Sequence, residues 1–170
     1  MYIPIILGTA REGRFSESVA IFMLEQAKKL GLRTELIDVR DYRMEATDNT
    51  QESEAAKRLS EKISEADAFV IVSPEYNHGY PGELKMMLDL LLNQYYKRPV
   101  GFCGVSMGFA GGARAVEQLK LVSIRLGMMP INGVLYFPKV RELFENGIIK
   151  DESFYARSEK FLKSLISYVK

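Results

Sequence analysis

Five short apolar runs alternate along the chain with segments in which apolar residues recur at helical spacing. The runs occupy residues 2–7, 33–39, 67–73, 99–106 and 131–137. Their length and apolar content are typical of buried strands. Strands that alternate with helices in this way predict an α/β fold, in which a parallel sheet is covered by helices on both faces.

The helical segments lie between these runs and after the last one. The first helix is expected to begin near Ser16 and to end at Gly31, because glycine readily adopts the backbone conformation that stops a helix. A last helix is expected to include residues 161–169. The most regular stripe follows Pro81 and Gly82. Its apolar members are Leu84, Met87, Leu88, Leu91, Leu92 and Tyr95.

The 170 residues contain no internal repeat, low-complexity tract or flexible linker, so we expect a single domain over residues 1–170. In such sheets, ligands bind beyond the carboxyl ends of the strands, where the strand order reverses. The loops after the first, third and fourth runs contain the unusual sequences GTAREGRFSES (8–18), SPEYNHGYPG (73–82) and SMGFAGGA (106–113). We therefore expect a binding site at this edge of the sheet.

Composition and charge exclude several other classes of protein. With 23 basic and 22 acidic residues, the formal net charge is +1, which gives no strong field for binding nucleic acid or an acidic membrane. The one cysteine, Cys103, excludes an internal disulfide and a multi-cysteine metal site, and it fits a reducing compartment. No signal-peptide pattern and no apolar run of about 20 residues is present. We therefore expect a cytoplasmic protein without nucleic-acid or membrane partners.

The loop after the first run has part of the spacing of a triphosphatase P-loop. Gly8 and Gly13 form a G-x-x-x-x-G pattern. A nucleoside triphosphatase needs lysine next, to reach the terminal phosphates, and then a hydroxyl residue to bind magnesium. This chain has Arg14 and Phe15 at those two positions, so the pattern argues against a triphosphatase.

The same loop is suited to a single phosphate group. Thr9, Ser16 and Ser18 offer hydroxyl groups, and the Arg11 guanidinium can clamp phosphate oxygens. The free amides and positive end of a helix that begins near Ser16 attract an anion. A helix capped by Ser16, with solvated arginines beside it, explains the same residues, and the loop alone leaves both interpretations open.

The loop after the third run is more specific. Residues 73–89, SPEYNHGYPGELKMMLD, resemble the signature of the NADPH-dependent FMN reductase family, in which Pro-Glu-Tyr-Asn ends a strand and Pro-Gly-x-Leu-Lys opens a helix. Gly8, Thr9 and Arg11 resemble the Gly-Ser/Thr-x-Arg motif of that family. Residues 106–122 resemble its third segment, so the similarity runs in order over most of the chain.

The resemblance implies a flavodoxin-like three-layer sandwich, with a five-stranded parallel sheet of order 2-1-3-4-5 and helices on both faces. It also implies the residues that bind FMN. Around the FMN phosphate we expect Thr9, Arg11, Ser16, Ser18 and the amides near Glu17. Along the flavin ring we expect Pro74, Glu75, Tyr76, Asn77, Gly79, Ser106, Gly108 and Gly111.

The function implied by the resemblance is an FMN-dependent oxidoreductase with NADPH or NADH as electron donor. A quinone, azo compound, metal ion, flavin or oxygen would accept the electrons in a ping-pong cycle, and the protein would supply binding and orientation. A non-enzymatic electron carrier like flavodoxin is the alternative, but such carriers are usually strongly acidic, which fits a net charge of +1 poorly. A flavin-binding sensor is a third class, for which no dedicated segment is present. Dimers and tetramers are common in this family, so the resemblance implies a homodimer or a homotetramer.

A few other residues have candidate roles. His78 is the single histidine and the one candidate catalytic residue, although we expect a hydrogen-bonding role for it. No metal site is expected, because no other ligands lie near it at short spacing. Cys103 is expected to be inert core. Met86 stands where the family often has asparagine, and with Tyr95 and Tyr96 it is a candidate for a dimer contact.

Overall fold

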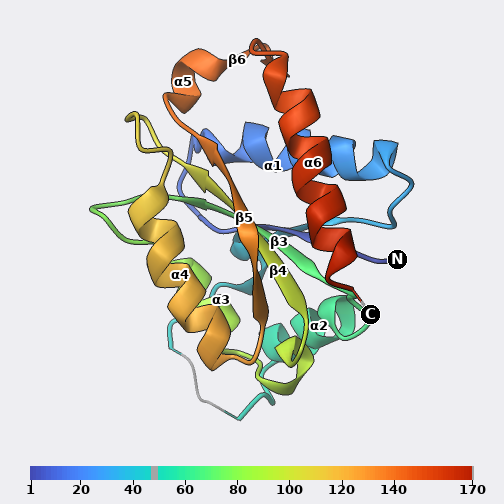
Figure 1. Ribbon diagram of the computed structural model, residues 1–170. Coiled ribbons are helices and arrows are strands. Elements are labelled where there is room, and N and C mark those ends of the chain that lie inside the picture. The colour runs from blue at the N-terminus through green and yellow to red at the C-terminus, as the bar shows by residue number, and fades with distance from the viewer. Residues whose placement is uncertain (47–49, 170) are drawn as a thin grey trace.

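A parallel sheet of five strands forms the middle layer of the structure (Figure 1). The computed structural model describes residues 1–46 and 50–169. The strands are β1 (Ile5–Leu7), β2 (Leu36–Asp38), β3 (Phe69–Pro74), β4 (Pro99–Val105) and β5 (Met129–Phe137). They are ordered β2-β1-β3-β4-β5, and every neighbouring pair is parallel. The expected order is therefore confirmed.

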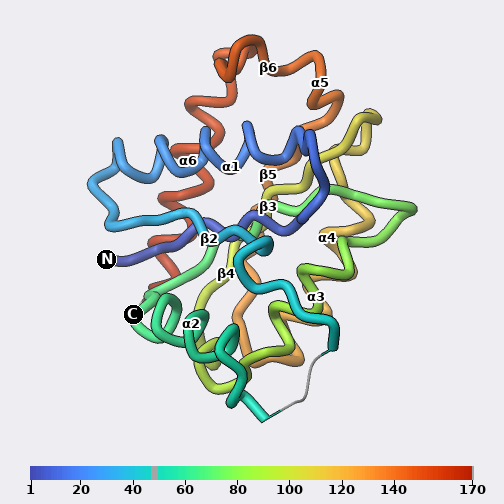
Figure 2. The backbone as a smooth tube through the Cα atoms, turned by 180° about the vertical axis from the view of Figure 1, so that it is seen from behind, coloured from blue at the N-terminus to red at the C-terminus, as the bar shows by residue number. Residues whose placement is uncertain are grey.

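Helices cover both faces of this sheet, as Figures 1 and 2 show from opposite sides. One face is covered by α1 (Ser16–Lys29) and α6 (Ser153–Ser167). The other is covered by α2 (Glu54–Ile63), α3 (Gly82–Leu88) and α4 (Ala113–Arg125). Gly31, just after α1, has φ +76°, in line with its expected role as a helix stop. Within the part of the chain that the structure describes, no helix is long and apolar enough to cross a membrane.

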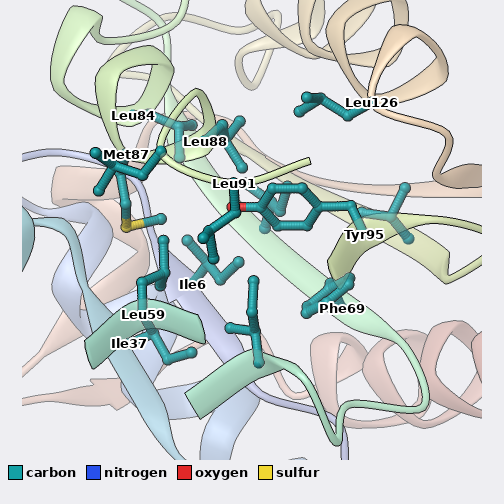
Figure 3. Close-up of a cluster of buried hydrophobic side chains, with 14 of the residues drawn as sticks. Ile6, Ile37, Leu59, Phe69, Leu84, Met87, Leu88, Leu91, Tyr95 and Leu126 are labelled. Atoms are coloured by element: carbon teal, nitrogen blue, oxygen red, sulfur yellow. The ribbon is translucent and has the colours of Figure 1, made fainter. Parts of the chain in front are cut away.

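Alternate residues of the strands enter two different hydrophobic cores. On β3, Phe69 and Ile71 pack with the layer of α2, α3 and α4, whereas Val70 and Val72 pack with α1 and α6. Figure 3 shows part of the first core, where Met87 of α3 lies above Leu59 and Phe69 lies beside Tyr95. Because both faces of a central parallel strand are covered, its sequence is apolar throughout, and this explains the continuous runs.

The helix after Pro81 is shorter than the apolar stripe predicts. Helix α3 ends at Leu88, and a turn and the short 3₁₀ helix η2 (Asn93–Tyr95) follow it. Leu91 and Tyr95 are still buried in the same core, but Leu92 is exposed. Two short helical segments joined by a turn bury nearly the same residues as one long helix. The spacing of apolar residues therefore did not reveal the break.

A small excursion between β5 and α6 was not predicted from the sequence. It consists of α5 (Val140–Leu143) and a hairpin of β6 (Phe144–Glu145) with β7 (Ile148–Ile149). The Asn-Gly pair at its turn has positive φ at both residues, which is the usual chemistry of a tight hairpin. Val140 and Ile149 are buried against α1 and α6. Strands of two residues are too short to give a recognisable apolar pattern.

Alanine at Gly112 would test how closely the loop before α4 packs on the sheet. Gly112 has φ +86°, and an added Cβ would lie 2.6 Å from the Val105 amide nitrogen. Both the left-handed backbone and this contact oppose a side chain, so we expect Gly112→Ala to lower the free energy of unfolding by about 3 kcal/mol. Urea denaturation measures this loss.

The matched control is Gly133→Ala in β5. A Cβ at Gly133 has no atom within 4 Å. We expect this control to change the free energy of unfolding by less than about 1 kcal/mol. Equal losses in the two variants would contradict the packing argument.

Candidate functional site

A cavity of about 300 Å³ lies at the carboxyl ends of β1, β3 and β4. It is lined by residues 11–16, 74–76 and 105–107 and by Val140, and we call it the first cavity. The strand order reverses here, because β2 lies on one side of β1 and β3 lies on the other. The first cavity therefore lies at the edge of the sheet where the sequence predicts a binding site.

A second cavity of about 660 Å³ adjoins the first. The two share Arg11, Glu75 and Tyr76, and the second also contacts Asn77 and residues 80–83. Three loops therefore build the site. We call them the first loop (residues 8–16), the second loop (residues 74–81) and the third loop (residues 106–112).

The first loop presents unused hydrogen-bond donors at the start of α1. Among residues 1–46 and 50–169, none accepts a backbone hydrogen bond from the amides of residues 12–16. Ser16 is only 1% exposed, and its hydroxyl has no partner among the described residues. Buried polar groups normally have partners, so an orphaned hydroxyl beside free helix amides fits an anionic ligand such as a phosphate group.

The alternative of a helix capped by Ser16, with solvated arginines beside it, fits only Arg11, which is exposed. No side chain caps α1, whose N-cap position is occupied by Phe15. Arg14 is buried, with 5% of its surface exposed. Its guanidinium donates to both carboxylate oxygens of Asp38 and to Glu17. Arg14 therefore lies beneath the loop and supports it.

Asp38, at the end of β2, is the main partner of this guanidinium. Burial raises the pKa of the Asp38 carboxyl, but the hydrogen bonds from the Arg14 side chain and the Arg40 amide outweigh that effect. The pKa of Asp38 therefore lies below the ordinary value for aspartate. At neutral pH the carboxylate is charged and pairs with Arg14.

Thr9 joins the first loop to the second. Its side chain is fully buried, and its hydroxyl accepts the Arg11 amide at 3.3 Å and lies 3.0 Å from the Tyr76 hydroxyl. The Arg11 guanidinium lies 5.4 Å from the centroid of the Tyr76 ring. The Thr9 hydroxyl is therefore used inside the protein, whereas the exposed Arg11 lines both cavities.

The second loop contains a tight hairpin turn. Tyr76 and Gly79 exchange two backbone hydrogen bonds of 2.8 and 2.9 Å. Between them, Asn77 and His78 have φ +50° and +68°. Positive φ at both central residues is typical of a two-residue type I′ turn, a conformation that asparagine tolerates better than most residues. This turn holds His78 exposed at its tip.

Helix α4 fixes the position of this turn. The Glu75 carboxylate, 10% exposed, accepts the Arg114 amide at 3.1 Å and the Arg114 guanidinium at 3.2 Å. The Gln118 side chain donates to the His78 carbonyl oxygen at 3.0 Å. Glu75 thus binds the first turn of α4, where a carboxylate is favoured.

The third loop is held mainly through its backbone. The Gly108 carbonyl oxygen accepts from the Ser106 hydroxyl and the Lys139 amide, both at 3.0 Å. Gly111 has φ +62°, and an added Cβ would lie 2.8 Å from the Cβ of Tyr136. These two glycines shape the loop, and Ser106 lines the first cavity.

The cavities include some of the expected residues and leave out others. Those that line the first cavity are Arg11, Ser16, Pro74, Glu75, Tyr76 and Ser106. Asn77 lines only the second cavity. Those that line neither are Thr9, Glu17, Ser18, Gly79, Gly108 and Gly111.

Sequence reasoning missed several residues around the first cavity. Arg14 had a weak signal, because it stands at the position of the P-loop lysine. Asp38 is the one acidic residue near the end of the apolar run at residues 33–39, which is also a weak signal. Phe15, Met107 and Val140 line the cavity as apolar surface and had no signal as binding residues.

The polar groups and the apolar surface of the first cavity are suited to binding a ligand. Within residues 1–46 and 50–169, no group of three His, Cys, Asp or Glu side chains is arranged for a metal ion. Cys103 is fully buried, and burial raises the pKa of its thiol. The first cavity combines free amides, hydroxyl groups and apolar surface, which suit a phosphate group attached to a flat ring system.

The sheet order, the two helical layers and the cavity at the reversal of strand order define a flavodoxin-like α/β protein. The profile of the NADPH-dependent FMN reductase family matches residues 1–142. The chain therefore belongs to the NADPH-dependent FMN reductase family, and the resemblance of its motifs is confirmed.

Individual relatives agree with this result. The chain is 30% identical over 149 residues to an NAD(P)H-dependent FMN reductase of Schizosaccharomyces pombe, with 81% of this chain and 74% of the relative covered. It is 32% identical over 139 residues to the quinone reductase of Escherichia coli K12, with 78% and 74% covered. The solved NAD(P)H:(acceptor) oxidoreductase of Paracoccus denitrificans shares the fold, with a TM-score of 0.86 at 22% identity, and the match covers 99% of this chain and 96% of that one.

Substitutions at His78 test whether the turn depends on backbone conformation. In His78→Gly the left-handed backbone is relieved of strain, at some cost in chain entropy, so we expect the free energy of unfolding to rise by about 0.5 kcal/mol. In His78→Val a β-branched residue is forced into the same conformation, and we expect a fall of about 1–2 kcal/mol. Urea denaturation compares the two. A similar loss in both variants would show that the imidazole itself holds the turn.

Proposed function

We propose that this chain is an FMN-dependent NAD(P)H oxidoreductase that reduces a small-molecule acceptor in a ping-pong cycle. Membership of the reductase family supports the oxidoreductase class and the pairing of FMN with NAD(P)H. The observation that carries the proposal for this chain is the run of free amides at residues 12–16 beside the orphaned Ser16 hydroxyl. When bound, FMN supplies the redox chemistry by taking a hydride from the nicotinamide and passing electrons to the acceptor.

The first loop would hold the phosphate of FMN. The amides of residues 12–16 and the Ser16 hydroxyl supply neutral donors, and Arg11 supplies a charged one. The Glu17 amide already donates to the Arg14 carbonyl oxygen at 3.3 Å, so Glu17 and Ser18 would contribute through the dipole of the first turn of α1, which favours an anion. Thr9 would act indirectly, by holding Tyr76.

The second and third loops would hold the flavin ring. Pro74, Glu75, Tyr76 and Ser106 line the same cavity as the first loop, so they support contact with a ring attached to that phosphate. The four remaining predicted residues would act by shaping or extending these loops. They are Asn77, Gly79, Gly108 and Gly111.

Donor and acceptor would use the same open side of the ring in turn. The second cavity adjoins the first and shares the Tyr76 wall with it, so it offers space beside the ring for a second flat molecule. A quinone, azo compound, metal ion, flavin or oxygen would accept the electrons. Exchange of two substrates in one space supports a ping-pong order.

A non-enzymatic electron carrier remains the competing function for a flavodoxin-like fold. Two observations favour the enzyme. The net charge of +1 gives little electrostatic steering toward a protein partner. Two relatives, at 30% and 32% identity, are named as reductases.

We also propose a cytoplasmic homodimer or homotetramer. The surface of α4 exposes Leu121 and Ile124 by 71% and 59%, and Tyr96 is 61% exposed, an apolar surface that a second copy would cover. Met86 is half-buried, and Tyr95 is fully buried, so the expectation that Tyr95 lies at a dimer contact is wrong. Sedimentation of the purified protein tests the assembly.

Anaerobic reduction followed by steady-state kinetics tests the function. We expect the purified protein to show the absorption bands of oxidised flavin and to lose them on anaerobic addition of NADPH. With a quinone as acceptor and no partner reductase, double-reciprocal plots at several quinone concentrations should be parallel. Intersecting lines would contradict the ping-pong order, and an absence of turnover without a partner protein would favour the carrier.

Removal of the Arg11 guanidinium tests the phosphate site. A charge-assisted hydrogen bond contributes about 2 kcal/mol, so we expect Arg11→Ala to bind FMN about thirtyfold more weakly and to purify mostly colourless. Arg33→Ala is the control, because Arg33 is an exposed arginine that pairs with Glu65 and lines neither cavity. Full flavin occupancy of Arg11→Ala would contradict this role.

A further inference from the structure

Three consecutive carbonyl groups of the first loop are bound by two arginine side chains. Arg14 donates to the Thr9 carbonyl oxygen. Arg40 donates through Nε to the Ala10 carbonyl oxygen at 3.2 Å and through Nη2 to the Arg11 carbonyl oxygen at 2.6 Å. The backbone of the loop therefore rests on guanidinium groups along one side.

One carboxylate organises both arginines. Asp38 Oδ1 accepts from Arg14 Nη1 at 2.8 Å and from the Arg40 backbone amide at 2.9 Å. The second of these bonds begins the 3₁₀ helix η1 (Val39–Tyr42), which carries Arg40. Asp38 is paired in register with Leu7, the last residue of β1 before the first loop. The sheet thus places this carboxylate beside the loop that its two arginines hold.

The direction of the carbonyl groups determines the direction of the amides. No cis peptide bond occurs among the described residues, and in a trans peptide the N–H points opposite to the C=O. Because the Arg11 carbonyl points toward Arg40, the Glu12 amide points away from it. Glu12 is the first of the five residues with free amides that line the first cavity. The same contacts direct the three carbonyl oxygens toward the guanidinium groups of Arg14 and Arg40.

We propose that Arg40 and Arg14, both ordered by Asp38, are positioning residues that hold the first loop with its amides toward the phosphate of FMN. This inference rests on the proposed function, because it needs a phosphate ligand in the first cavity. It assigns a role to two guanidinium groups that bind carbonyl groups of the loop. A loop already held in its binding conformation loses less entropy when the ligand binds.

Arg40 allows a cleaner test than Arg14. Arg14 is buried against Asp38, so its removal would leave a partly buried carboxylate without its charge partner. Arg40 is half-buried, and among residues 1–46 and 50–169 its guanidinium donates only to the two loop carbonyl groups. Arg40→Met keeps the length of the side chain and removes both bonds. Arg40→Lys keeps the charge but loses the two-pronged donor.

Arg58→Met is the matched control. Arg58 also donates to a backbone carbonyl group, that of Asp41 in the same 3₁₀ helix, at 2.6 Å. No hydrogen bond of the Arg58 side chain to the first loop is present among the described residues. Arg58→Met therefore removes an arginine–carbonyl contact on η1 and leaves the contacts of Arg40 with the first loop in place.

The experiment titrates the flavin-free full-length chain with FMN and with riboflavin, which lacks the phosphate, and follows flavin fluorescence. For the unmodified chain we expect FMN to bind at least tenfold more tightly than riboflavin. We expect Arg40→Met to weaken FMN binding about tenfold and to leave riboflavin binding within twofold. Arg40→Lys should recover less than half of the lost FMN affinity, measured on a logarithmic scale. Arg58→Met should bind both ligands as the unmodified chain does.

Several outcomes would overturn the inference. Full recovery of FMN binding in Arg40→Lys would show that only the charge matters. Equal weakening of FMN and riboflavin would show a general structural role, and unchanged binding in Arg40→Met would show no role. If FMN does not bind the unmodified chain more tightly than riboflavin, the phosphate site of the proposed function is wrong as well. Failure of the inference alone leaves that preference intact, so the two failures are distinguishable.

Discussion

The ion pair between Arg14 and Asp38 joins the first loop to the end of β2, and the shape of the binding site depends on it. Burial of a guanidinium is costly unless its donors are satisfied. Here the two terminal nitrogens of Arg14 donate to two carboxylates and one carbonyl oxygen, whereas Nε has no hydrogen-bond partner among the described residues. Asp38 also accepts from the Arg40 amide in η1. The register of β1 and β2 brings Asp38 beside Leu7, so the sheet itself brings the charges together. The loop conformation is therefore a consequence of strand pairing.

The other side of the site is fixed from α4 by similar means. Glu75 binds the amide and guanidinium of Arg114, and Gln118 holds the turn of the second loop. The contact between the Thr9 and Tyr76 hydroxyl groups joins these two supported loops across the edge of the sheet. Both walls are therefore attached to secondary structure on opposite sides of the cavities. Such support suits a protein that positions a cofactor and leaves the chemistry to it.

The sequence predicted those features that follow from burial. Continuous apolar runs revealed the central strands β1, β3 and β4, which are covered on both faces. The edge strands β2 and β5 are only partly buried, and their apolar runs are interrupted by polar residues. The helix end at Leu88 was missed, since a turn can return Leu91 and Tyr95 to the same core. The roles of Arg14 and Arg40 were missed for another reason. Each depends on a contact with a residue distant in the sequence, and only the sheet register brings those partners together.

The third loop is anchored through its backbone, so its conformation does not depend on two of its side chains. Its backbone is bound at Ser106 and Gly108 by the amides of Val140 and Lys139, whereas Met107 and Phe109 extend outward, 55% and 87% exposed. Residues at those two positions can therefore be exchanged with little penalty to folding. Because Met107 also lines the first cavity, a different side chain at this position would change the surface of that cavity while the backbone of the loop keeps its anchors.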